Sequence, residues 1–195
     1  MHTNTVRAVA LLAFTSAASC SAVPRSNPSS GARFDPLNAR PETIAVAIGV
    51  PPAFQLRTGD AKLSLSFVDD AAAETVLLNE TVALEVLPNA QGAPRGGVRE
   101  KVYVLRVAAG DLGRLERAQA DILDFKARGE DGRGTVAVEV SGGCFAGPVP
   151  ETLPVSSWLQ TDPRDGFVRL TRSADAFAAF DPDIATTLRD NFIPC

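Results

Sequence analysis

The sequence predicts a mainly β fold in which two antiparallel sheets pack as a β-sandwich, with one short helix and an irregular α/β extension at the C-terminus. Three observations lead to this fold class. Strand-length segments alternate apolar and polar residues, they recur at intervals of roughly ten to fifteen residues, and loops rich in Gly and Pro separate them. Amphipathic helices do not alternate with these segments, which disfavours a parallel α/β sheet.

Two segments show the alternation most clearly. In residues 42–50, bulky Ile44, Val46, Ile48 and Val50 alternate with small residues, and residues 61–68 place apolar and polar side chains on opposite faces. Such alternation is typical of antiparallel sheets with one face in water. Many short strands joined by turns resemble an immunoglobulin-like or related sandwich, which we place over residues 42–143. Further strands are expected at residues 75–79, 82–87, 101–108 and 135–140.

A helix is expected at residues 111–119. Apolar residues from Leu112 to Phe125 recur at spacings of three and four, Asp111 is a candidate N-cap, and Gly129 is a candidate stop. Residues 120–127 stay open between two interpretations. They either continue this helix or form a strand that pairs through a hairpin with residues 135–140.

The pattern changes after Cys144, where four prolines within about twenty residues interrupt strand continuity. Short elements return at residues 167–170 and 173–180, and a helix begins at Asp181 and Pro182 and runs to about Asn191. We expect residues 144–195 to form an extension laid over the sandwich. Its apolar side is expected to consist of Trp158 and the aromatic residues Phe145, Phe177, Phe180 and Phe192. In a sharper interpretation, Trp158 is exposed and binds a protein partner or a glycan.

The first nineteen residues have the order of a secretory signal. One basic residue, Arg7, precedes a short apolar run and a stretch of small residues. The apolar run is well short of the ~20 residues that a membrane-spanning helix needs. The motif Ala17-Ala18-Ser19-Cys20 resembles the lipobox of bacterial lipoproteins, with Ala17 where Leu is usual. The resemblance implies that Cys20 is acylated and becomes the mature N-terminus.

The segment that follows is expected to be a tether. Residues 20–41 are rich in Pro and Ser and poor in large apolar side chains, so they cannot bury enough surface to order themselves. Ser21 after the cysteine resembles the residue that directs lipoproteins to the outer membrane. The resemblance therefore implies a protein of the bacterial cell envelope, held at the outer membrane and facing the periplasm.

The remaining cysteines are expected to form a disulfide bond. With Cys20 acylated, Cys144 and Cys195 are left as an even number of thiols in an oxidising compartment. This bond would fix the C-terminus to the end of the last sandwich strand.

The residue inventory limits the possible chemistry. The single His is His2, within the expected signal, so a mature chain has no imidazole for a catalytic triad or a His-ligated metal. We therefore expect no metal and no cofactor. A pair of carboxylates could still hydrolyse a glycoside, although turns and solvated faces explain the same residues. The candidate acids are Asp69, Asp70, Glu100, Asp121, Asp124, Asp162 and Asp165.

These observations predict a binding or scaffolding protein of the envelope more readily than an enzyme. The net charge of −4 argues against nucleic acid as a partner, which leaves the membrane and another envelope protein. A carboxylate-dependent hydrolase of envelope polysaccharide is the alternative enzyme. An envelope inhibitor or sensor is a further alternative that the sequence does not separate from the scaffold.

Overall fold

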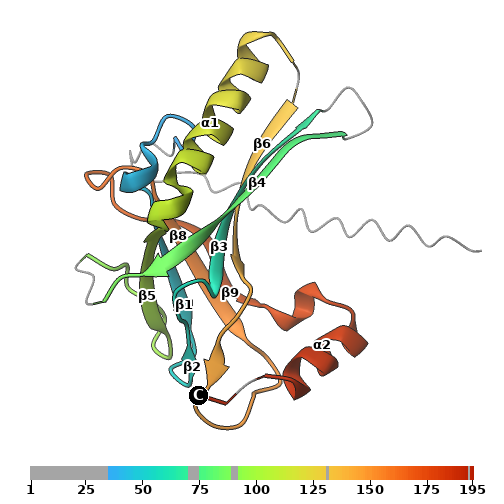
Figure 1. The fold of residues 1–195 in the computed structure, drawn as a ribbon. Helices are drawn as coiled ribbons and strands as arrows, with labels where there is room; N and C mark the ends of the chain where they lie inside the picture. Colours follow the sequence, from blue (N-terminus) through green and yellow to red (C-terminus); the bar gives the residue numbers. More distant parts are fainter. Residues whose placement is uncertain (1–34, 70–74, 89–91, 131, 193) are drawn as a thin grey trace, which may run out of the picture.

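The computed structural model describes residues 35–69, 75–88, 92–130, 132–192 and 194–195, and it has a mainly β, antiparallel fold. The expected signal peptide, Cys20, Asp70 and most of the expected tether lie outside the described residues. Seven strands form one sheet in the order β6-β3-β4-β5-β1-β8-β9, and two short strands, β2 (Phe54–Gln55) and β7 (Cys144–Phe145), form a second. Figure 1 shows the large sheet curling below helix α1, with α2 at the opposite end.

The large sheet has two halves that share β4. One half consists of β6 (Gly132–Val140), β3 (Ala61–Asp69) and β4 (Thr75–Val86). The other continues from β4 through β5 (Lys101–Val107), β1 (Ala45–Val50), β8 (Pro154–Gln160) and β9 (Val168–Asp175). The twelve-residue β4 pairs with β3 up to Ala83 and with β5 from Leu84 onward. Hydrogen bonding therefore runs through both halves, and the expected separation into two sheets is not confirmed.

One hydrophobic core is enclosed by the curl of the sheet. Alternate residues of β1, among them Val46 and Ile48, share this core with Leu65 of β3, Leu84 of β4 and Leu159 of β8. The period-two pattern of the sequence thus predicted the buried faces of the strands correctly. Side chains from both halves therefore meet in one main core, and a smaller apolar cluster around Ala47, Val104 and Trp158 lies on the other face of β5, β1 and β8.

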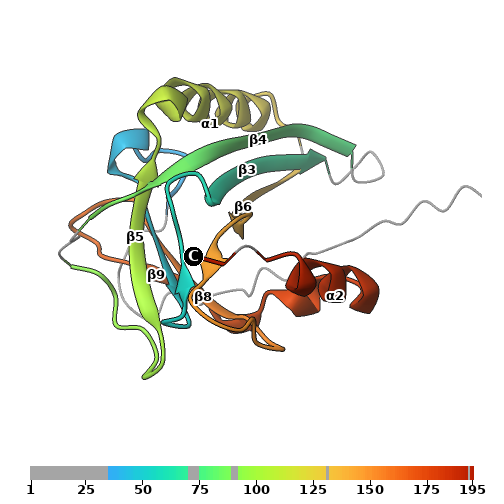
Figure 2. The ribbon, with the colours of Figure 1, turned by 60° about the horizontal axis from the view of Figure 1, so that its bottom comes forward.

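Helix α1 (Leu112–Ala127) covers the core on the side of β3 and β4, as Figure 2 shows. Leu115, Ala118 and Ile122 are its buried apolar residues, at the spacing of one helix face. The helix continues to Ala127, so the alternative in which residues 122–127 form a hairpin strand is wrong. β6 pairs with β3 instead, and it begins at Gly132, three residues before the strand expected at 135–140.

The residues after Cys144 are part of the central sheet and are not merely laid over it. β8 begins at Pro154 and pairs with β1 from Ser156 to Gln160. A proline is compatible with the first residue of a strand. After β9 the chain forms the short helix η3 (Phe177–Ala179) and then α2 (Pro182–Asp190), close to the expected helix. The other short helices are η1 (Pro41–Thr43) and η2 (Ala109–Asp111).

The C-terminus is fixed by a disulfide bond and by aromatic packing. Cys144 and Cys195 are bonded, as expected, with their Cα atoms 5.1 Å apart. Beside the bond lies an aromatic cluster in which neighbouring ring centroids are 4.9 to 6.1 Å apart with edge-to-face geometry. This aromatic cluster consists of Phe54, Phe145, Phe177 and Phe192.

Candidate functional site

Trp158 is buried, in agreement with the first of the two interpretations of the sequence. Trp158 lies in β8 with 3% of its surface exposed, so the interpretation in which this indole binds a partner is wrong. Ala47 and Gly49 of β1 leave room for the ring, and a Cβ atom built on Gly49 would approach Trp158 to 3.2 Å. The guanidinium of Arg169 lies 5.2 Å from the ring centroid. Trp158 therefore packs on the outer side of the sheet, opposite the main core.

One hollow of the described surface is an open, mostly polar groove of about 760 Å³. It lies between residues 35–43 and the turn that joins β8 to β9. Asp162 and Asp165, two of the candidate acids, line it together with Arg40 and Arg164. Arg164 donates to Asp162 at 2.6 Å through its guanidinium and at 2.8 Å through its amide, and these bonds lower the pKa of Asp162 to about 2. Asp162 is therefore a poor proton donor for a glycosidase at neutral pH.

Glu100 is held in a network of donors at the end of the loop before β5. Its carboxylate accepts hydrogen bonds from the hydroxyls of Ser156 at 2.7 Å and Ser173 at 3.2 Å, and from the amide of Gly97 at 2.6 Å. Burial raises the pKa of Glu100, but these donors and the charge of Arg169 outweigh burial and bring the pKa below its usual value. A carboxylate stabilised in its charged form is a weak base.

The Glu100 network has a structural role that its location explains. Pairing between β8 and β9 is irregular at Ser156, and Ser173 has a φ of +44°, which is costly for a residue other than glycine. The Ser156 hydroxyl accepts the Ser173 amide at 3.0 Å while it donates to Glu100. Glu100 thus fastens the loop of residues 92–100 to the irregular part of β8 and β9.

The remaining candidate acids are spread over the molecule. Asp121 and Asp124 are exposed on α1, and Asp69 lies at the end of β3. None of these elements contributes a residue to the lining of the groove. Asp162 and Asp165 line the groove together, whereas the other described candidates, Asp69, Glu100, Asp121 and Asp124, are not among its lining residues. The structure therefore does not bring the sequence-predicted acids together around one cleft.

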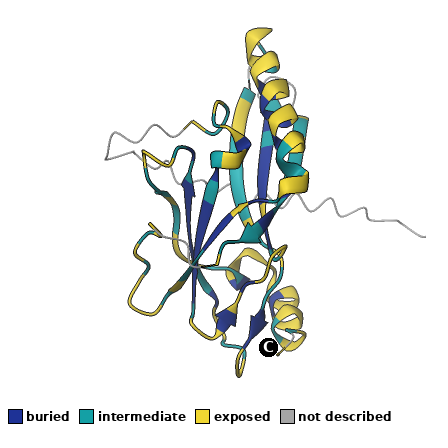
Figure 3. Cartoon of the chain, turned by 60° about the vertical axis from the view of Figure 1, so that its left-hand side comes forward, coloured by how far each residue is buried: buried dark blue, intermediate teal, exposed yellow. Residues whose placement is uncertain are grey.

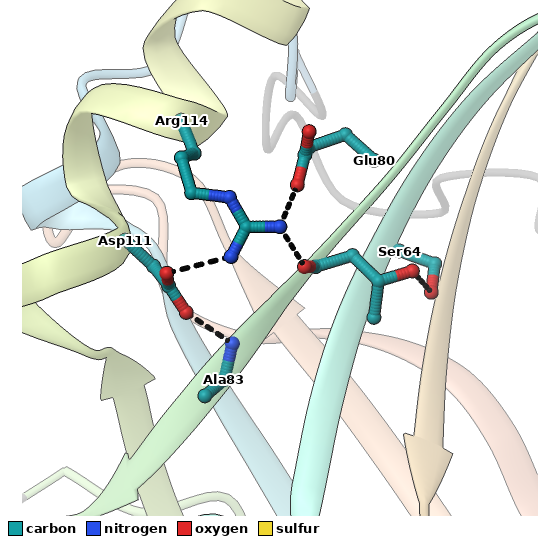
Figure 4. Close-up of polar contacts among 6 residues, drawn as sticks. Ser64, Glu80, Ala83, Asp111 and Arg114 are labelled. Atoms are coloured by element: carbon teal, nitrogen blue, oxygen red, sulfur yellow. Dashed lines mark hydrogen bonds and ion pairs between the residues drawn. The ribbon is translucent and has the colours of Figure 1, made fainter.

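Asp111 and Arg114 connect α1 to β4 at the residue where β4 changes its partner strand (Figure 4). The Asp111 carboxylate accepts the amide of Ala83 at 2.8 Å and a guanidinium hydrogen of Arg114 at 2.8 Å. Arg114 also donates to Glu80 and to the carbonyl of Thr81, whose hydroxyl is bonded to Ser64 of β3. Asp111, expected as a side-chain N-cap, instead satisfies a strand amide.

We predict that Asp111→Ala lowers the free energy of unfolding by about 1 to 2 kcal/mol at pH 7, because the Ala83 amide loses a charged acceptor. The Ala83 amide and then Arg114 hold the pKa of Asp111 below its ordinary value. This stabilisation is complete above about pH 4 and is lost as the pH falls through the lowered pKa. Urea unfolding of both proteins between pH 2 and 7 measures it, with Asp121→Ala, on the exposed face of α1, as the control. A difference between Asp111→Ala and wild type that persists unchanged at pH 2 would contradict this account.

The most exposed apolar surface with a regular pattern is on α2. Phe180 and Ile184 are each 49% exposed and Leu188 is 38% exposed, although all three are large and apolar. Ile184 and Leu188, four residues apart, lie on the same side of the helix, and Phe180 lies just before its N-cap. We call these three residues the α2 ridge. Phe180 was expected to pack on the domain with the other aromatics, and its exposure corrects that expectation.

The opposite side of α2 is anchored on the domain. Ala185 is buried in the core, and the Arg189 guanidinium lies 5.8 Å from the ring centroid of Phe177 and donates to the Ala185 carbonyl at 3.2 Å. The disulfide bond of Cys195 holds the chain five residues after the helix. The helix is therefore fixed in orientation while the α2 ridge faces outward, and Figure 3 shows α2 as largely exposed beside the C-terminus.

None of the helices in the described part of the chain has the length and apolar character needed to cross a bilayer. No protein-family model, curated protein or solved structure matches this chain.

Proposed function

We propose that this protein is a lipid-anchored component of the bacterial cell envelope, held at the outer membrane through Cys20 and facing the periplasm. Its domain binds or scaffolds another envelope protein and carries out no catalysis of its own. In fold, we propose that the two halves of the curled sheet, which enclose one core, make this domain a relative of immunoglobulin-like sandwiches.

The observation that carries the binding role is the α2 ridge. An exposed set of large apolar side chains on a helix that is itself fixed by a disulfide bond has the properties of a protein-binding surface. The lipobox-like motif at Ala17 to Cys20 supports the anchor. The Cys144–Cys195 bond supports an oxidising compartment, since such bonds are rare where glutathione keeps thiols reduced.

The arrangement of the two ends supports a tethered binding protein. Residues 35–41 are the last part of the expected tether, but they are held on the domain, where Gln119 of α1 donates to the carbonyls of Pro36 and Ala39. These residues and α2 lie at opposite ends of the domain in Figures 1 and 2. A flexible segment of about 20 residues reaches roughly 25 Å, so the domain stays near its membrane. With its anchored end toward the bilayer, such a domain presents α2 away from the lipid.

The anchor is tested by growing the producing bacterium with a clickable palmitate analogue. We expect label on the full-length protein and complete loss of label in Cys20→Ser, together with transfer of the protein from the membrane to the soluble fraction. Cys144→Ser is the matched control and is expected to keep the label. Label retained by Cys20→Ser, or wild-type protein that stays unlabelled and soluble, would overturn the proposed anchor.

A further inference from the structure

We infer that the α2 ridge inserts into an apolar groove of a partner protein and that basic side chains line the rim of that groove. This inference rests on the proposed function, because it names the surface and the kind of partner through which the tethered domain acts. It places the recognition helix on this chain and the groove on the partner, which is a common mode of protein recognition.

The shape of the surface favours a groove over a flat partner. Ile184 and Leu188 project from a single short helix, and the exposed Phe180 precedes that helix by two residues. Apolar residues at a spacing of four on a helix are the pattern that such grooves accept. The helix stands at the edge of the domain in Figures 1 and 2, so a groove could close around it from outside.

The charges around the ridge favour basic residues on the partner. Asp181, Asp183 and Asp190 are exposed at the two ends of α2. The single basic residue of the helix, Arg189, is turned toward the domain, where it contacts Phe177 and Ala185. The outer side of α2 therefore presents apolar side chains between carboxylates, and complementary charges on a partner would be positive.

The same charges argue against lipid as the occupant. A bacterial membrane surface carries anionic headgroups, which attract basic helices and repel acidic ones. The expected tether, residues 20–41, also ends on the opposite side of the domain from α2. A second copy of this chain would bring the same carboxylates face to face, which is unfavourable for a self-complementary interface.

The partner is identified by a photo-crosslinking amino acid at Thr187, an exposed neighbour of the ridge, in the full-length protein inside its own cells. The same amino acid at Ala120, exposed on α1, is the control. We expect a crosslinked protein from Thr187 that Ala120 does not give. That protein is then purified and titrated against the domain carrying Cys20→Ser, which removes the lipid from the measurement.

Two sets of variants test the inference in that titration. We expect Ile184→Asp with Leu188→Asp to weaken binding at least tenfold, whereas Leu123→Asp on α1, with the same 38% exposure as Leu188, leaves it unchanged. We expect Asp183→Lys with Asp190→Lys to weaken binding several-fold and to reduce its salt dependence, whereas Asp121→Lys with Asp124→Lys does not. Thermal unfolding of each variant checks that the domain remains folded, which we expect because the substituted residues are exposed.

Four results would overturn the inference. The first two are the absence of a specific crosslink at Thr187 and an affinity for the purified partner that the ridge variants leave unchanged. The third is sedimentation of the Cys20→Ser protein as a dimer that Ile184→Asp dissociates. The fourth is flotation of the protein with phosphatidylglycerol-containing vesicles that Ile184→Asp abolishes. Each of these results can be distinguished from failure of the proposed lipid anchor at Cys20. Loss of palmitate labelling with a specific crosslink retained overturns the anchor alone, and labelling without a crosslink overturns the ridge alone.

Discussion

Removal of the Cys144–Cys195 bond by the double substitution Cys144→Ser/Cys195→Ser is expected to lower the free energy of unfolding by about 4 kcal/mol. The bond joins residues 51 positions apart, and constraining a loop of that length in the unfolded chain gives this magnitude in the chain-entropy model. A loss of this size is a large part of the stability of a typical domain. Chemical denaturation of the oxidised wild type and of the double variant, both carrying Cys20→Ser, measures it.

The control is the wild-type protein after its disulfide bond has been reduced, because its free energy of unfolding should then approach that of the double variant. Native-state hydrogen exchange adds a local measurement. We expect the amides of α2 and of Cys195, which donates to the Phe145 carbonyl at 3.0 Å, to lose protection first. A double variant as stable as the oxidised wild type would contradict the role assigned to the bond.

The second large effect is expected for Phe67→Ala, at about 3 to 5 kcal/mol. Phe67 of β3 has 0% of its surface exposed and stacks on Phe125 of α1 with ring centroids 5.6 Å apart. Its ring also lies against β6, since a Cβ atom built on Gly132 would come within 2.6 Å of it. Truncation leaves a cavity where β3, β6 and α1 meet, and rigid strands on both sides limit how far it can collapse.

Phe180→Ala is the matched control for this prediction, because it removes the same side chain from a position that is 49% exposed. We expect it to change stability by no more than about 0.5 kcal/mol. Urea unfolding of both variants at pH 7 decides the matter. Similar destabilisation by the two substitutions would show that burial of Phe67 does not have the energetic role that the structure indicates.

The sequence predicted local structure well where periodicity and capping decide it. The alternation in residues 44–50 and 61–68 gave the buried faces of β1 and β3, and the Asp181-Pro182 pair gave the start of α2. The expected strands at 75–79 and 82–87 are one strand, β4, because Asn79, Glu80 and Thr81 remain paired with β3. Three consecutive polar residues within a strand resemble a turn when the partner strand is unknown.

Pairing between distant strands could not be predicted from local patterns. β8 lies in a proline-rich segment, and only its partner β1, more than one hundred residues earlier, makes it a central strand. Trp158 is buried for the same reason, since its place is made by Ala47 and Gly49 on that partner. The number of sheets also depends on which strands meet across β4, and no local signal contains this information.

The candidate site shows the same division. The Cys144–Cys195 pair followed from counting thiols, whereas the α2 ridge was missed, although Phe180, Ile184 and Leu188 stand at a regular spacing of four in the sequence. That spacing identifies one side of a helix but does not say whether the side is buried. In the structure the opposite side of α2 faces the domain, because Ala185 is buried there and Arg189 lies over the ring of Phe177.

The position of β1 in the sheet affects when the domain can fold. β1 is the first strand of the described residues, yet its hydrogen-bonding neighbours are β5 and β8, which end at Val107 and Gln160. The middle of the sheet therefore cannot close until most of the polypeptide is available, and such non-local pairing slows folding to the range of milliseconds to seconds. A chain delivered N-terminus first through a narrow translocation channel would remain unfolded during transit and acquire its structure only after release on the far side.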